Sequence, residues 1–160
     1  ALCKGAGGFK AFLKPLGGFQ AFSRGYTEPL LAKLPDSSFG ASSFYDGSYR
    51  PHHIKFTHQD GHGWEPKDGE QAGSHVQVDL GQPRTVVHVE TKCGRGSETC
   101  EEFSVAVSSD GVTFVETDSY TSPKGEISTM ISPPLHGRYV RFLPKRWNSF
   151  PCMKIELLGF

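Results

Sequence analysis

The sequence lacks long hydrophobic runs and an excess of charge of either sign. No stretch approaches the roughly 20 consecutive apolar residues that a membrane-spanning helix requires. The 17 Lys and Arg residues balance 17 Asp and Glu residues, so the formal net charge is +0 at pH 7. A chain without net charge has no long-range field to attract a polyanion. We therefore expect no nucleic-acid partner.

Signatures of catalysis and of metal binding are also missing. The 160 residues contain no GxSxG elbow, no HExxH pair, no P-loop and no GxGxxG turn. The histidines between His52 and His62 match no common zinc spacing, and the four cysteines form no CxxC pair. Glu101 and Glu102 are adjacent on an expected strand, so their side chains point to opposite faces and cannot share one substrate. We expect a protein that is not an enzyme and has neither a metal site nor a cofactor.

What the chain does contain is a series of short β-type runs separated by Gly, Pro, Asp and Ser. Val76, Val78 and Leu80 alternate with polar residues, as in a half-buried strand, and Ser109-Asp110-Gly111 predicts a hairpin turn. About eight strands are expected, over residues 39–43, 76–80, 85–91, 103–108, 112–117, 127–131, 138–143 and 153–158. The fold class is therefore all-β, a sandwich or jelly-roll barrel with long loops at one end.

The first residues differ in composition from the rest of the chain. Gly, Lys, Ala and Phe dominate residues 1–26, and the element Gly7-Gly8-Phe9-Lys10-Ala11-Phe12 recurs with Gln in place of Lys at residues 17–22. Two interpretations stand side by side: a partner-binding arm, and an extension whose Phe side chains fill gaps on the domain's own surface. We assign residues 1–33 to a Gly/Phe-rich extension and residues 34–160 to one domain.

The motifs of residues 34–160 resemble the discoidin family, also called the coagulation factor V/VIII type C domain. The matching motifs occur in the family's order: Ala41-Ser42-Ser43-Phe44, Gly63-Trp64-Glu65-Pro66, Val76-Gln77-Val78-Asp79-Leu80-Gly81, Val107-Ser108-Ser109-Asp110-Gly111, Pro133-Pro134, Arg138-Tyr139-Val140-Arg141-Phe142-Leu143-Pro144, Trp147 and Glu156-Leu157-Leu158-Gly159. The resemblance implies a distorted eight-stranded jelly roll whose loops form ligand-binding spikes at one end.

The resemblance also implies where a ligand binds. The first spike, residues 44–51, is most similar to the neuropilin and discoidin-receptor type and lacks the paired tryptophans of the clotting factors. The candidate ligand-binding residues on and beside the spikes are Tyr45, Asp46, Tyr49, Arg50, His52, Asp68 and Arg95. An aromatic face flanked by carboxylate and guanidinium groups suits a sugar ring or a peptide end.

The expected function is that of a secreted, extracellular recognition module that binds a glycan or glycoprotein in cell adhesion or matrix assembly. Two alternatives remain: a peripheral domain that binds phosphatidylserine in an anionic phospholipid surface, and peptide or growth-factor capture of the neuropilin type. Membrane insertion requires large apolar residues at the spike tips, and these tips are mostly small or charged, which favours the polar ligand. Some relatives hold a structural Ca²⁺ ion through loop carbonyls, and such a site has no recognisable sequence motif.

The cysteines depart from the family pattern, which joins the first and last residues of the domain. Four cysteines allow three pairings. A bridge from Cys93 to Cys100 would close a small loop and brace the second spike, and Cys3 to Cys152 would then join the extension to the last strand. We predict these two disulfides, with free buried thiols as the alternative.

Overall fold

The computed structural model describes residues 27–59, 62–93 and 96–160, apart from the side chain of Cys93. Within these ranges, eight strands and three short 3-10 helices are present: β1 (Glu28–Pro29), η1 (Asp36–Ser38), β2 (Phe39–Ala41), η2 (Pro51–Ile54), β3 (Val76–Cys93), β4 (Thr99–Ser108), β5 (Val115–Glu116), β6 (Tyr120–Thr121), η3 (Pro123–Gly125), β7 (Ile127–Asn148) and β8 (Met153–Gly159). No helix in these ranges is long and apolar enough to cross a membrane. The predicted all-β, eight-stranded fold is confirmed.

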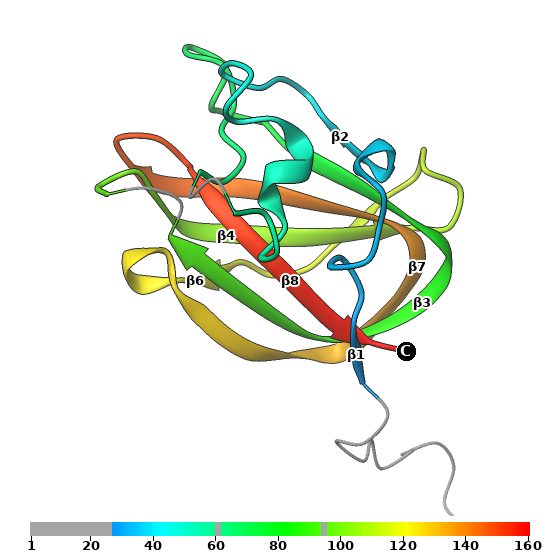
Figure 1. The fold of residues 1–160 in the computed structure, drawn as a ribbon. Helices are drawn as coiled ribbons and strands as arrows, with labels where there is room; N and C mark the ends of the chain where they lie inside the picture. The colour runs from blue at the N-terminus through cyan, green and yellow to red at the C-terminus, as the bar shows by residue number, and fades with distance from the viewer. Residues whose placement is uncertain (1–26, 60–61, 94–95) are drawn as a thin grey trace, which may run out of the picture.

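Two long strands form the frame of the jelly roll. Strands β3 and β7, of 18 and 22 residues, pair antiparallel along most of their length and bend as they cross the molecule (Figure 1). The strand order is β1-β8-β3-β7-β4-β5, with β2 added to β3 and β6 added to β4. Each long strand unites two runs that we expected to be separate strands. The break expected at Gly81 is instead a register shift between Asp79 and Arg84 inside β3.

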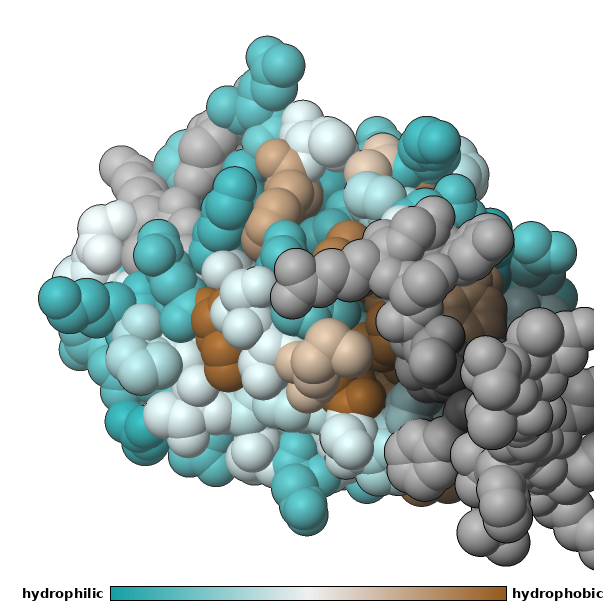
Figure 2. Space-filling view, turned by 90° about the horizontal axis from the view of Figure 1, so that it is seen from below, coloured by the Kyte–Doolittle hydropathy of each residue, from teal (hydrophilic) through white to brown (hydrophobic). Residues whose placement is uncertain are grey.

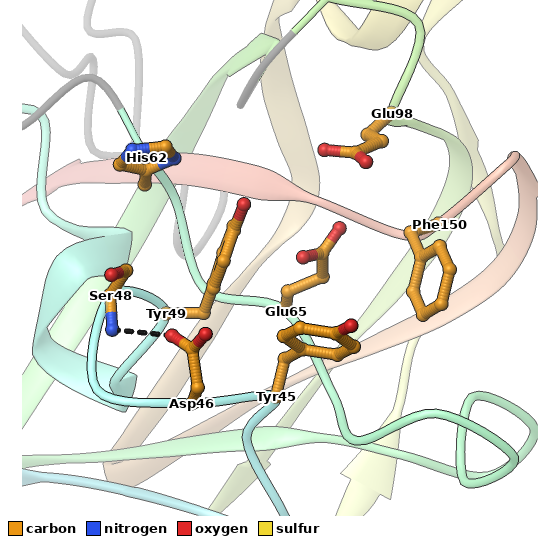
Figure 3. Close-up of a pocket in the computed structure, with 8 residues that line it drawn as sticks. All are labelled: Tyr45, Asp46, Ser48, Tyr49, His62, Glu65, Glu98 and Phe150. Atoms are coloured by element: carbon orange, nitrogen blue, oxygen red, sulfur yellow. Dashed lines mark hydrogen bonds between the residues drawn. The ribbon is translucent and has the colours of Figure 1, made fainter.

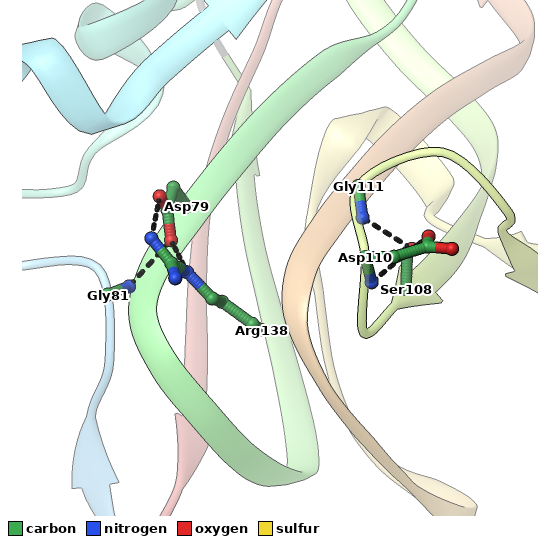
Figure 4. A network of polar contacts seen from close by, with 6 residues as sticks. All are labelled: Asp79, Gly81, Ser108, Asp110, Gly111 and Arg138. Atoms are coloured by element: carbon green, nitrogen blue, oxygen red, sulfur yellow. Dashed lines mark hydrogen bonds and ion pairs between the residues drawn. The ribbon is translucent and has the colours of Figure 1, made fainter.

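The alternation in β3 sets its register against β7. Val76 and Val78 point into the core, while Gln77 and Asp79 lie on the outer face. Both Asp79 oxygens accept hydrogen bonds from Arg138, each at 2.8 Å (Figure 4), and this pairing lowers the pKa of the Asp79 carboxyl. A slip by one residue would break this pairing and turn the valines outward.

The core includes part of the segment that we assigned to the extension. Strand β1 pairs with β8, and the next residues, Leu30 and Leu31, are buried. The backbone N–H of Leu31 donates to Oε1 of Glu156 at 2.8 Å. The sheet therefore begins before residue 34, our expected domain boundary, whereas the repeats within residues 1–26 lie outside the described residues.

A tryptophan anchors the long loop between β2 and β3. Trp64 is fully buried, and its backbone forms an antiparallel bridge with Met153, with N···O distances of 3.0 and 3.2 Å. Its indole Nε1 donates to the carbonyl of Ser43 at 2.9 Å. Gly63 precedes it because a Cβ there would lie 2.2 Å from the carbonyl oxygen of Met153. The motif therefore fastens the loop to the first residue of β8.

The cysteines differ in part from the expected bridges. Cys100 carries a buried free thiol, where we predicted a bond to Cys93, and its Sγ donates to the carbonyl of Glu102 at 3.4 Å. Burial raises the pKa of this thiol to about 12. Cys152 is buried on the neighbouring chain segment, where its carbonyl accepts the Cys100 N–H at 3.3 Å. Cys3 lies outside the described residues, so its pairing with Cys152 stays a prediction.

At the end of the molecule that carries β1 and the C-terminus, the visible described surface is mainly hydrophilic or neutral in hydropathy (Figure 2). In the view from below, hydrophobic side chains appear as small separate patches among polar ones (Figure 2). Scattered apolar residues of this kind are normal on a soluble domain. The visible described surface at this end therefore offers no broad apolar face.

The predicted hairpin after β4 is confirmed and is held by one carboxylate. Strand β5 pairs with β4, joining Val107 to Val115. Oδ1 of Asp110 accepts the backbone N–H groups of Val112 and Thr113 at 2.8 and 2.9 Å. Gly111 follows with φ of +78°, a conformation that favours glycine. Hydrogen bonds from Thr113 and Val112 lower the pKa of Asp110 to about 2.

We predict that substitution of Gly63 by Ala destabilises the domain by about 1–3 kcal/mol, because the added Cβ overlaps the Met153 backbone and β8 must move. Chemical denaturation monitored by tryptophan fluorescence measures the change. Gly40→Ala is the matched control, since a Cβ at Gly40 meets nothing within 4 Å. Equal stability of the two variants would contradict this account of the anchor.

The depressed pKa of Asp110 predicts a defined acid response. A group whose folded pKa lies below its unfolded value, about 3.9 for Asp, stabilises the fold above that unfolded value. This contribution should be complete above about pH 4 and should disappear as the pH falls through the folded pKa of about 2. NMR titration of the carboxyl carbon measures the pKa directly. Asp110→Asn should remove this part of the pH dependence, and a measured pKa near 4 would refute the hydrogen-bonded turn.

Candidate functional site

A cavity of about 390 Å³ opens among the loops at one end of the jelly roll. Four separate segments supply its lining: the first spike, the loop that contains Trp64, the segment just before β4 and the turn between β7 and β8. The lining residues are Tyr45, Asp46, Ser48, Tyr49, His62, Glu65, Glu98 and Phe150 (Figure 3). The cavity therefore depends on the fold to bring distant residues together.

Aromatic rings form a continuous row along this cavity. The Tyr45 ring meets Tyr49 and Phe150 edge to face, with centroids 5.7 and 5.9 Å apart, and Tyr49 meets His62 at 5.0 Å. Tyr45 is 50% exposed, whereas Tyr49 is only 7% exposed. Tyr45 thus presents a ring to a ligand at the mouth, and Tyr49 belongs to the wall. Edge-to-face aromatic contacts of this kind hold the rings in fixed orientations.

The first spike takes its shape from a tight turn. Oδ1 of Asp46 accepts the N–H of Ser48 at 2.7 Å, and the carbonyl of Asp46 accepts the N–H of Tyr49 at 3.1 Å. Asp is favoured at such a position because its side chain bonds the backbone two residues on. The N–H of Tyr45 donates to the Glu65 carbonyl at 2.9 Å, which joins the spike to the loop anchored by Trp64.

Three of the described lining residues are carboxylic acids. Glu65 is 3% exposed, and Figure 3 shows its carboxylate and that of Glu98 pointing into the same space. Asp46 adds a third acidic side chain at the spike. Nδ1 of His62 is buried and has no hydrogen-bond partner, so it is available to a ligand. The cavity therefore combines an aromatic surface with several hydrogen-bond acceptors.

Three of the sequence-predicted residues meet in this cavity, namely Tyr45, Asp46 and Tyr49. Arg50 is exposed and lies outside the lining, with its guanidinium carbon 6.0 Å from the centre of the Phe44 ring. Some residues of the predicted spike therefore line the cavity, and others lie on the outer surface.

His52 belongs to a separate histidine cluster. Its Nε2 lies 3.6 Å from the Asp36 carboxylate, and its ring meets His53 at 4.5 Å between centroids. Burial lowers the pKa of His52, and the Asp36 charge opposes this effect. The ring of His53 stacks on His58 at 3.8 Å. This cluster packs η2 against the loop that follows it and does not line the cavity.

The remaining predicted residues also lie elsewhere. Asp68 is exposed and accepts a hydrogen bond from Gln71 at 3.3 Å within its own loop, outside the lining. Arg95 falls outside the described residues. In the parts of the chain that are described, no three His, Cys, Asp or Glu side chains are arranged to hold a metal ion.

Sequence reasoning missed five lining residues: Ser48, His62, Glu65, Glu98 and Phe150. Glu65 carried a signal, since it follows the tryptophan of a quoted family motif. Ser48 lies inside the spike that we had marked. Glu98 lies in the second spike, between Cys93 and Cys100, although only Arg95 was chosen there, whereas Phe150 is about 100 residues from the first spike and no local pattern marks it.

Comparisons with known proteins agree with this architecture. The chain is 28% identical over 158 residues to lactadherin from Sus scrofa, which covers 84% of this chain and 39% of lactadherin. The chain thus spans well under half of that relative. In structure it is similar to discoidin II from Dictyostelium discoideum, with a TM-score of 0.71, 14% identity, and coverage of 84% of this chain and 58% of that one.

A second structural neighbour was solved with a sugar. The family 32 CBM from C. perfringens NanJ, in complex with galactose, aligns with a TM-score of 0.64 at 14% identity, covering 82% of this chain and 98% of that module. At such identities these two structural likenesses show the fold alone. A sequence model of the F5/8 type C domain matches residues 38–157, and the chain therefore belongs to the F5/8 type C domain family.

Proposed function

We propose that this domain is a non-enzymatic recognition module that binds a carbohydrate through the cavity at the first spike. The observation that carries the proposal is the half-exposed ring of Tyr45 beside the acceptors of Asp46 and Glu65. The apolar face of a sugar ring packs on an aromatic face, while its hydroxyl groups donate to carboxylates. A few placed polar groups beside aromatic walls are typical of small-ligand sites.

The relatives support a carbohydrate ligand. The structural neighbour from C. perfringens binds galactose and shares the jelly roll whose loops build the cavity here. In this proposal the module acts outside the cell, where glycans and glycoproteins are displayed, and it serves adhesion or matrix interaction. The rigid sheet holds the loops at fixed separations, so the loops set specificity.

An anionic phospholipid surface is the competing ligand. Such a surface would meet the exposed carboxylate of Asp46 in the described lining, and like charges repel at short range. It would instead have to engage exposed apolar side chains on the spike, of which Phe44 is the largest outside the cavity. The two ligands therefore depend on different residues, and variants separate them.

We predict that Tyr45→Ala weakens binding to a glycan array and to the best-bound soluble sugar by about 1–3 kcal/mol, because the stacking surface is lost. Calorimetry measures the affinity. Phe44→Ala is the matched control, since Phe44 is 42% exposed but lies outside the lining. If the protein binds phosphatidylserine vesicles tightly, and this binding is lost in Phe44→Ala and kept in Tyr45→Ala, the ligand is an anionic phospholipid surface and the proposal is wrong.

Asp68 gives a second test, because the family resemblance implies that it binds the ligand, whereas the cavity proposed as the site is lined by other described residues. We predict that Asp68→Asn binds the same sugar with unchanged affinity, whereas Glu65→Gln weakens it by about 1.5–3 kcal/mol through loss of a charged acceptor. Circular dichroism and melting temperature establish that Glu65→Gln is folded. The opposite ranking of the two variants would move the site toward the Asp68 loop.

A further inference from the structure

One histidine connects the first spike to the short helix that follows it. His53 of η2 is 6% exposed, and its Nδ1 lies 2.6 Å from the carbonyl oxygen of Ser48. A carbonyl oxygen can only accept a hydrogen bond, so this Nδ1 carries the hydrogen and donates it. Resting on the proposed function, we infer that His53 is a positioning residue for the first spike, and that the histidine cluster around it makes the cavity sensitive to acid.

The contact with Ser48 bears directly on the wall of the cavity. The Ser48 carbonyl belongs to the same planar peptide group as the N–H of Tyr49, which donates to the Asp46 carbonyl at 3.1 Å. This peptide is therefore held from both sides, by the turn of the spike and by His53. It leads into the Tyr49 side chain, whose ring meets Tyr45 at 5.7 Å in the same cavity (Figure 3). A shift of this peptide would move the aromatic row.

Two further imidazole rings pack against His53. The ring of His58 stacks on it, with 3.8 Å between centroids and an angle of 18° between the planes. The ring of His52 lies 4.5 Å from His53 and 5.8 Å from His58. Imidazole is the side chain whose charge ordinarily changes between about pH 5 and 8, and two protonated rings at such distances repel each other. The three rings therefore pack well when neutral and poorly when charged.

The charged surroundings oppose protonation of the cluster. The described charged groups beside the rings or beside the Ser48 contact are Asp36, Asp46, Arg50, Lys55 and Lys154. The Asp36 carboxylate lies 3.6 Å from Nε2 of His52, but it also pairs with Lys55 at 2.8 Å. The Nζ of Lys154 donates to the carbonyl of His58 at 2.7 Å. Added positive charge on the rings thus meets three cations, while one carboxylate already pairs with a lysine and the other bonds the spike backbone.

Acid should therefore loosen the spike. Burial lowers the pKa of His52. A histidine whose folded pKa is lowered stabilises the fold above its unfolded value of about 6.5, and this contribution is lost as the pH falls through the folded value. Repulsion between protonated rings would move His53 away from the Ser48 carbonyl and release the peptide before Tyr49. The cavity is then formed at neutral pH and loosened at acid pH.

Amide hydrogen exchange measured by NMR tests this without a ligand, with the N–H of Tyr49 as the reporter. After correction for the intrinsic effect of pH, we expect its protection factor to fall at least about tenfold between about pH 7.5 and about pH 5.5 in the wild-type chain, while amides of the β3–β7 pair keep theirs. His53→Asn retains an N–H donor at the place of the ring Nδ1 and cannot be protonated in this range. Its protection factor should change less than about twofold.

His136→Asn is the matched control, because His136 is exposed, contacts Thr85 and lies outside both the cluster and the described lining. This variant should keep the full acid response. His62 also titrates beside Tyr49, but it is present in every variant, so the difference between the wild-type chain and His53→Asn does not come from it. Equal protection at both pH values in the wild-type chain, or the same loss in His53→Asn, would overturn the inference.

Galactose, which the structural neighbour binds, is the probe that links the spike to ligand binding. We expect the wild-type chain to bind it at least about tenfold more weakly at the lower pH, and His53→Asn to bind it equally at both. Affinity that is unchanged by acid while the protection of Tyr49 falls would overturn the inference that the cluster controls the cavity. Absence of binding to galactose and to a glycan array at both pH values, with protection still falling in acid, would instead contradict the proposed function and support the role of His53 in the spike.

Discussion

The bridge between Trp64 and Met153 is the contact on which the candidate site depends. It joins the middle of a long loop to the first residue of β8, and the buried indole fills the space between them. The loop between β2 and β3 contains little regular structure apart from η2, so without this anchor its length would cost entropy with few contacts in return. The position of Glu65, and through its carbonyl that of Tyr45, follows from this one attachment.

The sheet provides the rigid frame of the molecule, and the loops at one end provide the candidate site. The pairing of β3 with β7 forms a rigid frame. The ion pair between Asp79 and Arg138 on the outer face and the buried valines on the inner face both require the same register. The loops at one end then hold acidic and aromatic side chains at fixed separations. Because the frame carries the stability, the loops can place a buried carboxylate such as Glu65 in a cavity.

Much of the fold was predictable from the sequence because its signals are local. The alternation in residues 76–80 and the Ser109-Asp110-Gly111 turn each depend on a few neighbouring residues, and both are confirmed. Each family motif is likewise a short local pattern, and the family that their order indicates is confirmed. Strand continuity was not predictable in the same way. Gly81 and Pro83 suggest a stop, yet pairing with β7 carries β3 through them with only a register shift. A partner strand outweighs a weak local preference.

The candidate site also combines features that follow from local sequence with features that depend on long-range contacts. That Tyr45, Asp46 and Tyr49 share a spike follows from the sequence alone, because residues this close in the chain belong to one turn. Tertiary contacts, in contrast, bring Glu98 and Phe150 to the same cavity and leave Asp68 and His52 outside its described lining. That choice rests on long-range strand pairing, which brings distant residues together through backbone hydrogen bonds that carry no mark in the local sequence.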